Sequence, residues 1–416
     1  MTLMLRKMLF VLSAAILLFA ASAQAGDVSL RDGDVVVMAG DSITAQHLHS
    51  NYIEAYCVTR FPKLNLHFRN AGVGGDKASR LIVRLDYDVF CWSPTVVSIE
   101  LGMNDSGKGP EAIAPYLDQM GTLIARIRKA GARPALLTSS PVNDITTPNW
   151  VTRNATLDAM ATALVEFAAR EEVPCADQFH PLFDLWSKNL KSPTPVPLGG
   201  DAVHPGPAGH LTMAYECLAG LGAPALVSSA TINRDTGKVA ATHCAVTNLK
   251  VEGDAISFDR TDDCLPMPIP ADARDALKLV PLSAKLNQYM LSVAVWLWDH
   301  EPAQNWTISI DGTKVATISF EELTKGWNMS EVTEGPIAAQ CRSVLDLIAK
   351  KEALVSRYRA LALPFAPERD KNPATDTPEK RSAAMAQVKE ELPAADAAIH
   401  DAAQPKPHHF EIAPAK

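Results

Sequence analysis

The chain has 416 residues with 39 basic and 47 acidic side chains, and its formal net charge at pH 7 is −8. Its 47% apolar and 21% charged residues are ordinary for a globular protein with a sizeable core, and the length favours two domains over one. The acidic balance argues against nucleic acid as a partner, because phosphate backbones are bound by clustered lysine and arginine.

The first 25 residues have the pattern of a secretory signal peptide. Arg6 and Lys7 precede an apolar run over residues 8–20, and an Ala-Gln-Ala cleavage site stands directly before Gly26. A transmembrane anchor is the alternative, but the apolar run is shorter than the roughly 20 residues that span a bilayer. We therefore expect residues 1–25 to be removed, and a secreted or periplasmic protein without a stable membrane span.

The seven cysteines contain no C-x-x-C pair, which excludes a zinc ribbon and a thioredoxin motif. Cys244 and Cys264 flank a predicted strand hairpin and are the expected disulfide in an oxidising compartment. Histidines and carboxylates show no metal-ligand spacing, so we expect neither a metal nor an organic cofactor.

Ser42 stands where an apolar run stops abruptly. Residues 35–40 predict a buried strand, and helical spacing follows over 44–59, so Ser42 falls in the turn between strand and helix. Open α/β sheets bind ligands at the carboxyl ends of their strands, and a helix N-terminus stabilises negative charge. The structural alternative is an N-cap serine, which helix starts also select.

Three further stretches place small or polar residues at predicted turns. A second strand over 64–70 runs into a glycine-rich turn over 71–76, whose N–H groups are free to meet a ligand. A third strand over 96–101 enters Gly-Met-Asn-Asp, which contains Asn104. Far downstream, Asp-Ala-Val-His over 201–204 places a carboxylate three residues before an imidazole and opens another helix.

In this order, the four stretches resemble the signature blocks of the SGNH hydrolases, the GDSL-type esterase superfamily. The resemblance covers roughly residues 33–222, and one local departure is Ile43, where the family name has leucine. It implies a flavodoxin-like three-layer α/β/α fold, with the active site at the carboxyl ends of the strands. The blocks are Gly40-Asp41-Ser42-Ile43, Gly75, Gly102-Met103-Asn104-Asp105 and Asp201-Ala202-Val203-His204.

The resemblance also implies a role for each signature residue. Ser42 would be the nucleophile, His204 the base that accepts its proton, and Asp201 the residue that orients the imidazole. The backbone N–H groups of Ser42 and Gly75 and the side-chain amide of Asn104 would form the oxyanion hole. The chain order Ser, Asp, His also occurs in α/β-hydrolases, but their G-x-S-x-G elbow is absent here.

The remaining polar residues of these blocks have structural interpretations. We expect Asp41 to cap the helix after the serine and Asp105 to hydrogen-bond within its loop. His210 belongs to the helix after the last block, and His47 and His49 lie on a helix face, so all three are expected to be structural.

Strands and helices alternate from Asp34 to Gly220, which predicts a parallel sheet with helices on both faces. We assign residues 26–222 to an α/β hydrolase domain with a five-stranded parallel sheet, whose last two strands cover 133–140 and 173–177. Further helices are expected over 79–90, 111–131, 150–171 and 207–220.

After residue 222 the pattern changes to short strands, and residues 223–363 are expected to form a smaller α+β appendage packed on the hydrolase domain. It contains hairpins turning at 252–254 and 311–312, a buried strand over 291–297 and a helix over 336–362. Its tryptophans favour core packing over sugar stacking. Residues 364–416 are rich in Pro, Ala, Lys and Glu, which predicts a disordered tail. The tryptophans of the appendage are Trp296, Trp298, Trp306 and Trp327.

The expected substrate is a short acyl ester, an acetate, on a carbohydrate outside the cytoplasm, either a small molecule or a polysaccharide. No lid-like apolar helix interrupts the blocks, and the loops after the strands carry polar residues such as Lys77, Ser106 and Asn143. The alternatives are an O-acyltransferase acting on sugars, a lysophospholipase or thioesterase, and a non-catalytic carbohydrate-binding module that keeps the fold. The sequence leaves the oligomeric state open.

Overall fold

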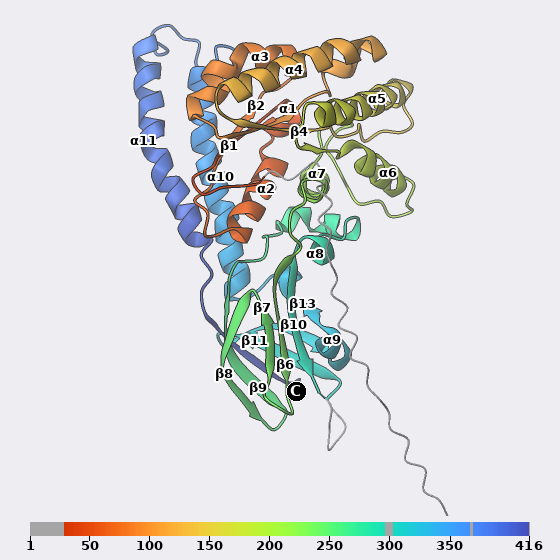
Figure 1. Ribbon diagram of the computed structural model, residues 1–416, viewed down its shortest axis with the longest axis vertical. Helices are drawn as coiled ribbons and strands as arrows, with labels where there is room; N and C mark the ends of the chain where they lie inside the picture. The colour runs from red at the N-terminus through yellow and green to blue at the C-terminus, as the bar shows by residue number, and fades with distance from the viewer. Residues whose placement is uncertain (1–28, 296–302, 367–368, 416) are drawn as a thin grey trace, which may run out of the picture.

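The computed structural model describes residues 29–295, 303–366 and 369–415. The predicted signal peptide, Trp296 and Trp298 lie outside these ranges. Figure 1 shows an α/β domain, which runs from β1 to α7, above two β-sheets that form a β domain. Helices α10 (Pro336–Ala362) and α11 (Pro378–Ala402) lie along one side of the α/β domain.

The α/β domain is built on one parallel sheet with the strand order β2-β1-β3-β4-β5, the flavodoxin-like order. Side chains of β1 alternate between two cores, with Val36 and Met38 on one face and Val37 and Ala39 on the other. Burial on both faces explains the continuous apolar runs. The predicted five-stranded parallel sheet is confirmed. Its strands are β1 (Val35–Gly40), β2 (His67–Gly72), β3 (Val96–Glu100), β4 (Arg133–Leu137) and β5 (Cys175–Ala176).

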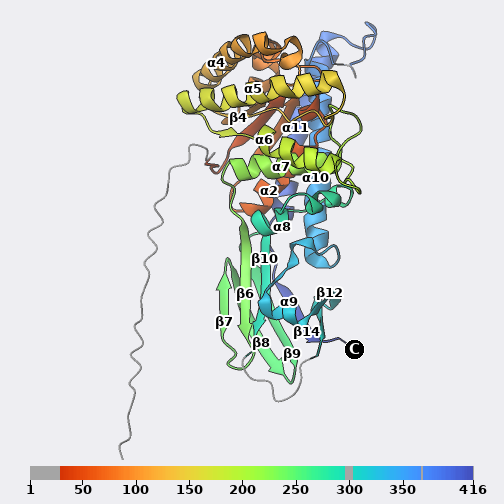
Figure 2. The same ribbon diagram turned by 90° about the vertical axis from the view of Figure 1, so that its right-hand side faces the viewer.

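Helices cover both faces of this sheet (Figures 1 and 2). The core on one face includes side chains of α2, α6, α7 and α10, and the core on the other includes side chains of α3 and α4, while α5 contributes to both. The helices are α1 (Ser42–Ala45), α2 (Leu48–Arg60), α3 (Ala78–Arg84), α4 (Ile113–Lys129), α5 (Pro148–Arg170), α6 (Phe179–Leu190) and α7 (Pro207–Gly220).

Three details differ from the sequence-based expectation. The helix expected over 44–59 is interrupted by His47, which adopts a left-handed conformation with φ 61° between α1 and α2. The helix expected over 79–90 is α-helical only to Arg84 and continues as a π-helix over Leu85–Val89. Helix α6 was not predicted, although its apolar face is buried.

The β domain consists of two sheets that share one apolar core. Both predicted hairpins, β8–β9 and β11–β12, are antiparallel pairs. Trp306 is buried in this core, as expected for a packing role. The first sheet has the order β13-β10-β6-β7 and the second the order β12-β11-β14-β9-β8. The strands are β6 (Leu226–Asn233), β7 (Val239–Thr242), β8 (Cys244–Glu252), β9 (Ala255–Asp262), β10 (Gln288–Ala294), β11 (Asn305–Ile310), β12 (Thr313–Ser319), β13 (Trp327–Asn328) and β14 (His408–Pro414).

The prediction of a disordered tail over 364–416 is wrong. Strand β14 inserts between β9 and β11, and Phe410 and Ile412 are fully buried there. Helix α11 packs on α10 through a few apolar residues that include Val388 and Leu392. Composition did not predict these elements because each has only a few apolar residues, which lie on one side of the helix or strand. The surface that covers those residues comes from earlier parts of the chain. The appendage therefore does not end at residue 363.

The expected disulfide between Cys244 and Cys264 does not form, and all seven cysteines are free. In the register of β8 and β9, Cys244 lies opposite Asp262, so Cys264 is two residues beyond the paired position. The two thiols contact different backbone carbonyls, those of Ser229 and Val227.

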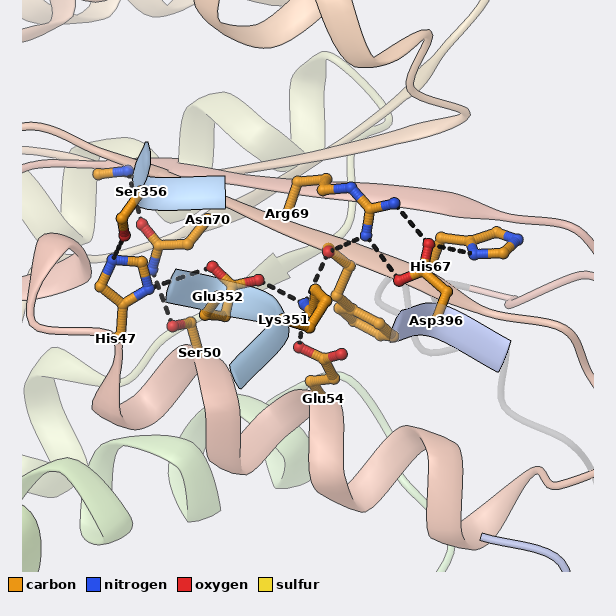
Figure 3. Close-up of polar contacts among 12 residues, drawn as sticks. His47, Ser50, Glu54, His67, Arg69, Asn70, Lys351, Glu352, Ser356 and Asp396 are labelled. Atoms are coloured by element: carbon orange, nitrogen blue, oxygen red, sulfur yellow. Dashed lines mark hydrogen bonds and ion pairs between the residues drawn. The ribbon is translucent and has the colours of Figure 1, made fainter. Parts of the chain in front are cut away.

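Helix α10 covers the predicted range and joins the two domains. Ile337 and Cys341 contribute to the β-domain core, whereas Val344 and Ile348 contribute to the core of the α/β domain. Further along the helix, the fully buried Lys351 ammonium group contacts carboxylates and the backbone (Figure 3). It donates to Glu54 at 2.8 Å and to the Phe68 carbonyl at 2.8 Å, and it also contacts Glu352.

We expect Lys351→Met to destabilise the protein by about 3–5 kcal/mol, because it leaves the buried carboxylates Glu54 and Glu352 without their cation. Lys350→Met is the matched control, since Lys350 is the neighbouring residue of the same helix and is exposed. Urea unfolding followed by circular dichroism measures both variants. Similar unfolding midpoints for the two would contradict the importance of the buried charge.

Candidate active site

Ser42 begins α1 directly after β1 ends, so the first turn of the helix surrounds its backbone. The preceding Asp41 is buried and caps this helix, since its Oδ1 accepts from the Ile43 N–H at 2.9 Å. Burial, together with the nearby charge of Glu100, raises the pKa of Asp41 well above its ordinary value. Asp41 therefore has the capping contact expected from the sequence.

The structure brings Ser42, His204 and Asp201 into one line of hydrogen bonds. The Nε2 atom of His204 lies 2.9 Å from Ser42 Oγ, and its Nδ1 lies 2.9 Å and 3.2 Å from the two carboxylate oxygens of Asp201. Asp201 Oδ1 also accepts from the backbone N–H groups of Val203 and His204, each at 2.7 Å. This local turn explains the spacing of three residues between the acid and the imidazole.

Hydrogen bonds from the backbone and the ring of His204 lower the pKa of Asp201 to about 2. The carboxylate is therefore charged at neutral pH and accepts hydrogen bonds, which favours the His204 tautomer with its proton on Nδ1. Nε2 then accepts a hydrogen bond from the Ser42 hydroxyl. This arrangement is chemically able to remove a proton from the serine.

Residues after His204 are tied to the serine side of the site by polar contacts that the sequence did not reveal. Gln46 Nε2 donates to the Pro205 carbonyl at 3.1 Å, and Gln46 Oε1 lies 3.1 Å from His210 Nε2. His210 Nδ1 lies 3.1 Å from His49 Nδ1, and His49 Nε2 lies 3.0 Å from Glu100. Only the three-dimensional structure reveals the part played by Gln46 and Glu100.

The buried histidines of this cluster have the structural role expected from the sequence. Burial and the nearby charges of His49 and His204 lower the pKa of His210 well below its ordinary value, so this ring is neutral. His210 and His49 are stacked with ring centroids 5.3 Å apart, and they connect α7 to α2.

Gly75 and Asn104 lie on neighbouring loops at the same edge of the sheet. Gly75 has φ 68°, and no atom lies within 4 Å of the position that a Cβ would take. Asn104 Nδ2 donates to the Asp76 carbonyl at 3.0 Å and makes a longer contact of 3.4 Å with Asp41. Asp105 accepts from the Ala78 N–H at 3.2 Å, as expected for a loop hydrogen-bonder.

The candidate site is open to solvent. Side-chain exposure is 38% for His204 and 60% for Asp201. Two cavities lie elsewhere, one of about 760 Å³ between α2, α10 and residues 266–274, and one of about 470 Å³ between residues 106–109 and the start of α5. Neither of these two cavities is lined by Ser42, Gly75, Asn104, Asp201 or His204.

The described residues contain no group of three or more His, Cys, Asp or Glu side chains arranged to hold a metal ion. Within the same ranges, no helix combines the length and the apolar character needed to cross a membrane.

We expect Gly72→Ala to destabilise the protein by about 1–3 kcal/mol, because the new Cβ would lie 2.6 Å from the Thr44 carbonyl carbon in α1. The loss should include displacement of the helix that carries Ser42. Gly74→Ala is the control, since a Cβ there meets no atom within 4 Å and φ is not positive. Thermal unfolding distinguishes the two, and equal midpoints would contradict close packing of α1 on β2.

Comparison with known proteins agrees with the blocks found in the sequence. Residues 38–211 match the GDSL-like lipase/acylhydrolase family. An acetylxylan esterase from Geobacillus stearothermophilus is 25% identical over 218 residues, which are 47% of this chain and 97% of that protein. The solved structure of a gut microbial diltiazem-metabolizing enzyme has a TM-score of 0.80 at 22% identity, covering 94% of this chain and 100% of its own.

The family match includes the segments that carry Ser42, Gly75, Asn104 and His204, and the sheet order is that of a flavodoxin-like fold. The structural similarity extends across α10, α11 and the β domain, so this whole architecture occurs in another protein. The α/β domain is therefore a GDSL-like lipase/acylhydrolase domain of the SGNH hydrolase superfamily, and the chain is a carboxylic ester hydrolase.

Proposed function

We propose that this esterase removes short acyl groups, acetyl above all, from carbohydrate O-esters, with Ser42, His204 and Asp201 as its catalytic triad. The observation that carries the proposal is the line of hydrogen bonds from Asp201 through His204 to Ser42, in which both junctions measure 2.9 Å. Nucleophile, base and orienting acid are thereby arranged as acyl transfer requires.

In the first step, Ser42 Oγ attacks the ester carbonyl while His204 Nε2 takes the hydroxyl proton. The anionic Asp201 stabilises the imidazolium that forms and keeps its ring oriented. His204 then gives the proton to the leaving alcohol, and an acyl-serine remains. Water, deprotonated by the same imidazole, releases the acid and restores the serine.

Donors for the oxyanion are the N–H groups of Ser42 and Gly75 and the side-chain amide of Asn104. One N–H of Asn104 is held by the Asp76 carbonyl at 3.0 Å, which orients the amide. The 3.4 Å contact with Asp41 is longer than an ordinary hydrogen bond, so the second N–H is available to a developing negative charge.

The solvent-accessible side chains of His204 and Asp201 and the polar loops around the serine support a hydroxyl-rich substrate over a long acyl chain. Similarity to an acetylxylan esterase supports acetate on carbohydrate. Export through the N-terminal signal would bring the enzyme to such polymers. Transfer of the acyl group to a sugar hydroxyl, and hydrolysis of lysophospholipids or thioesters, use the same machinery and are the competing functions.

We expect Asn104→Ala to lower kcat by about 10²–10³ with little change in KM, because the oxyanion develops only in the transition state. Ser42→Ala should lose more activity. Asn65→Ala is the control, since Asn65 is exposed and lies before β2, away from the strand carboxyl ends. Wild-type activity of Asn104→Ala on a short-chain ester would remove Asn104 from the proposed mechanism.

The substrate class is tested by p-nitrophenyl esters from acetate to palmitate, together with acetate release from acetylated xylan and pectin. We expect the highest kcat/KM on acetate and release of acetate from at least one polysaccharide. A preference for palmitate without release from either polymer would refute the carbohydrate acetate assignment.

Free sugars added to the assay test for transfer of the acyl group, since an acyltransferase would form new sugar esters instead of free acid.

A further inference from the structure

Arg359 lies near the end of α10, outside the residues that match the family model, and its guanidinium group is buried. Its Nε and Nη2 bind the two carboxylate oxygens of Asp88 at 2.7 Å and 3.0 Å. Its Nη1 donates to the Gly72 carbonyl at 2.8 Å. Arg359 therefore holds both the π-helix after α3 and the last residue of β2.

The same carboxylate continues into a chain of buried charges. Asp88 also contacts Arg84, whose Nη2 lies 2.7 Å from Asp76 Oδ2 and 3.2 Å from the Gly40 carbonyl. The side chains of Arg84, Asp76 and Asp88 are at most 1% exposed. Two cations and two carboxylates alternate along this chain, so each buried charge has a partner of opposite sign.

The ends of this charge chain lie beside the proposed oxyanion groups. Gly40 comes two residues before Ser42, Gly72 comes three residues before Gly75, and Asp76 follows Gly75 directly. Two backbone bonds connect these positions, from Val73 N–H to the Gly40 carbonyl at 3.0 Å and from Asp76 N–H to the Val73 carbonyl at 3.1 Å. The Asp76 carbonyl in turn receives the Asn104 amide at 3.0 Å.

Apolar packing also connects the C-terminal end of α10 to the turn after β2. Leu363 and Ala366, which follow the helix, form a small buried cluster with Val73. Lower on α10, Glu352 and Ser356 contact the two ring nitrogens of His47, each at 3.1 Å, at the junction between α1 and α2 (Figure 3). The helix therefore contacts both the segment that carries Ser42 and the turn that carries Gly75.

We propose that Arg359 is a positioning residue for the oxyanion hole, acting on Gly75 and Asn104 through the Gly72 carbonyl and through Asp88, Arg84 and Asp76. The inference rests on the proposed function for its catalytic consequence. An oxyanion donor works only within about 2.7–3.1 Å of the charge, so small shifts of this turn cost rate. An appended helix thereby sets the geometry of a site in the preceding domain.

The test compares Arg359→Gln with Arg357→Gln on the same helix. Arg357 is the control because its side chain is 47% exposed and its ion pair with Glu391 lies on the surface. We expect Arg359→Gln to lower kcat by about tenfold with KM nearly unchanged, and Arg357→Gln to match the wild type. Circular dichroism confirms that each variant is folded at the assay temperature.

Two further measurements separate positioning from general destabilisation. In an Asn104→Ala background, Arg359→Gln should lower kcat by clearly less than the tenfold expected in the wild type, because one of the two groups through which it acts is already missing. Amide hydrogen exchange over residues 72–77 should accelerate in Arg359→Gln and remain at the wild-type rate in Arg357→Gln. Full additivity with Asn104→Ala, or unchanged exchange over 72–77, overturns the proposal.

The outcomes also distinguish this inference from the proposed function. An active wild type whose Arg359→Gln variant keeps the wild-type kcat and exchange refutes positioning and leaves the esterase proposal intact. A wild type without activity on any ester refutes the proposed function, while faster exchange over 72–77 in Arg359→Gln still supports the structural control of this turn by α10.

Discussion

Buried charge is the constraint on which the arrangement of this protein depends. Lys351, Arg359 and Asp396 come from the two C-terminal helices, and each meets an opposite charge of the α/β domain out of contact with water. A buried ion is costly unless its partner is held in good geometry. The helices α10 and α11 are therefore restricted to one docking position on α2, β2 and the segment after α3.

This constraint has consequences for the site. In an open parallel sheet the functional groups lie on loops after the strands, and loops by themselves are mobile. Here Arg359 of α10 holds the Gly72 carbonyl at the start of the turn after β2, while the turn before α7 is tied through Gln46 to the serine side. Precise placement of the half-buried Ser42 is thus combined with solvent access to His204 and Asp201.

The C-terminal half also shows why domain boundaries read from composition are insecure. Strand β14 begins at His408 and completes a sheet whose other strands all end at or before Ser319, and α11 lies between them in sequence while packing on α10. A cut at residue 222 would remove Lys351, which neutralises Glu54, and Arg359, one of the two arginines that contact Asp88. The two regions differ in architecture, but they share buried charges and are therefore coupled in stability.

The sequence by itself determined what depends on local pattern. The five apolar runs, the turns at their ends, the hairpins turning at 252–254 and 311–312 and the helix over 336–362 all follow from periodicity and turn residues. The pairing of Asp201 with His204 is likewise local, because a turn of three residues brings the two side chains together.

Tertiary structure decided everything that requires a distant partner. Only the fold places Ser42 Oγ 2.9 Å from an imidazole 162 residues later, and only the fold gives Arg359 its place beside Gly72. The tail appeared disordered because its composition has few large apolar residues. Its order comes from the salt bridge of Asp396 to Arg69 and from the strand position between β9 and β11. Burial and charge pairing both require two surfaces in contact. A single segment of the sequence provides only one of those two surfaces.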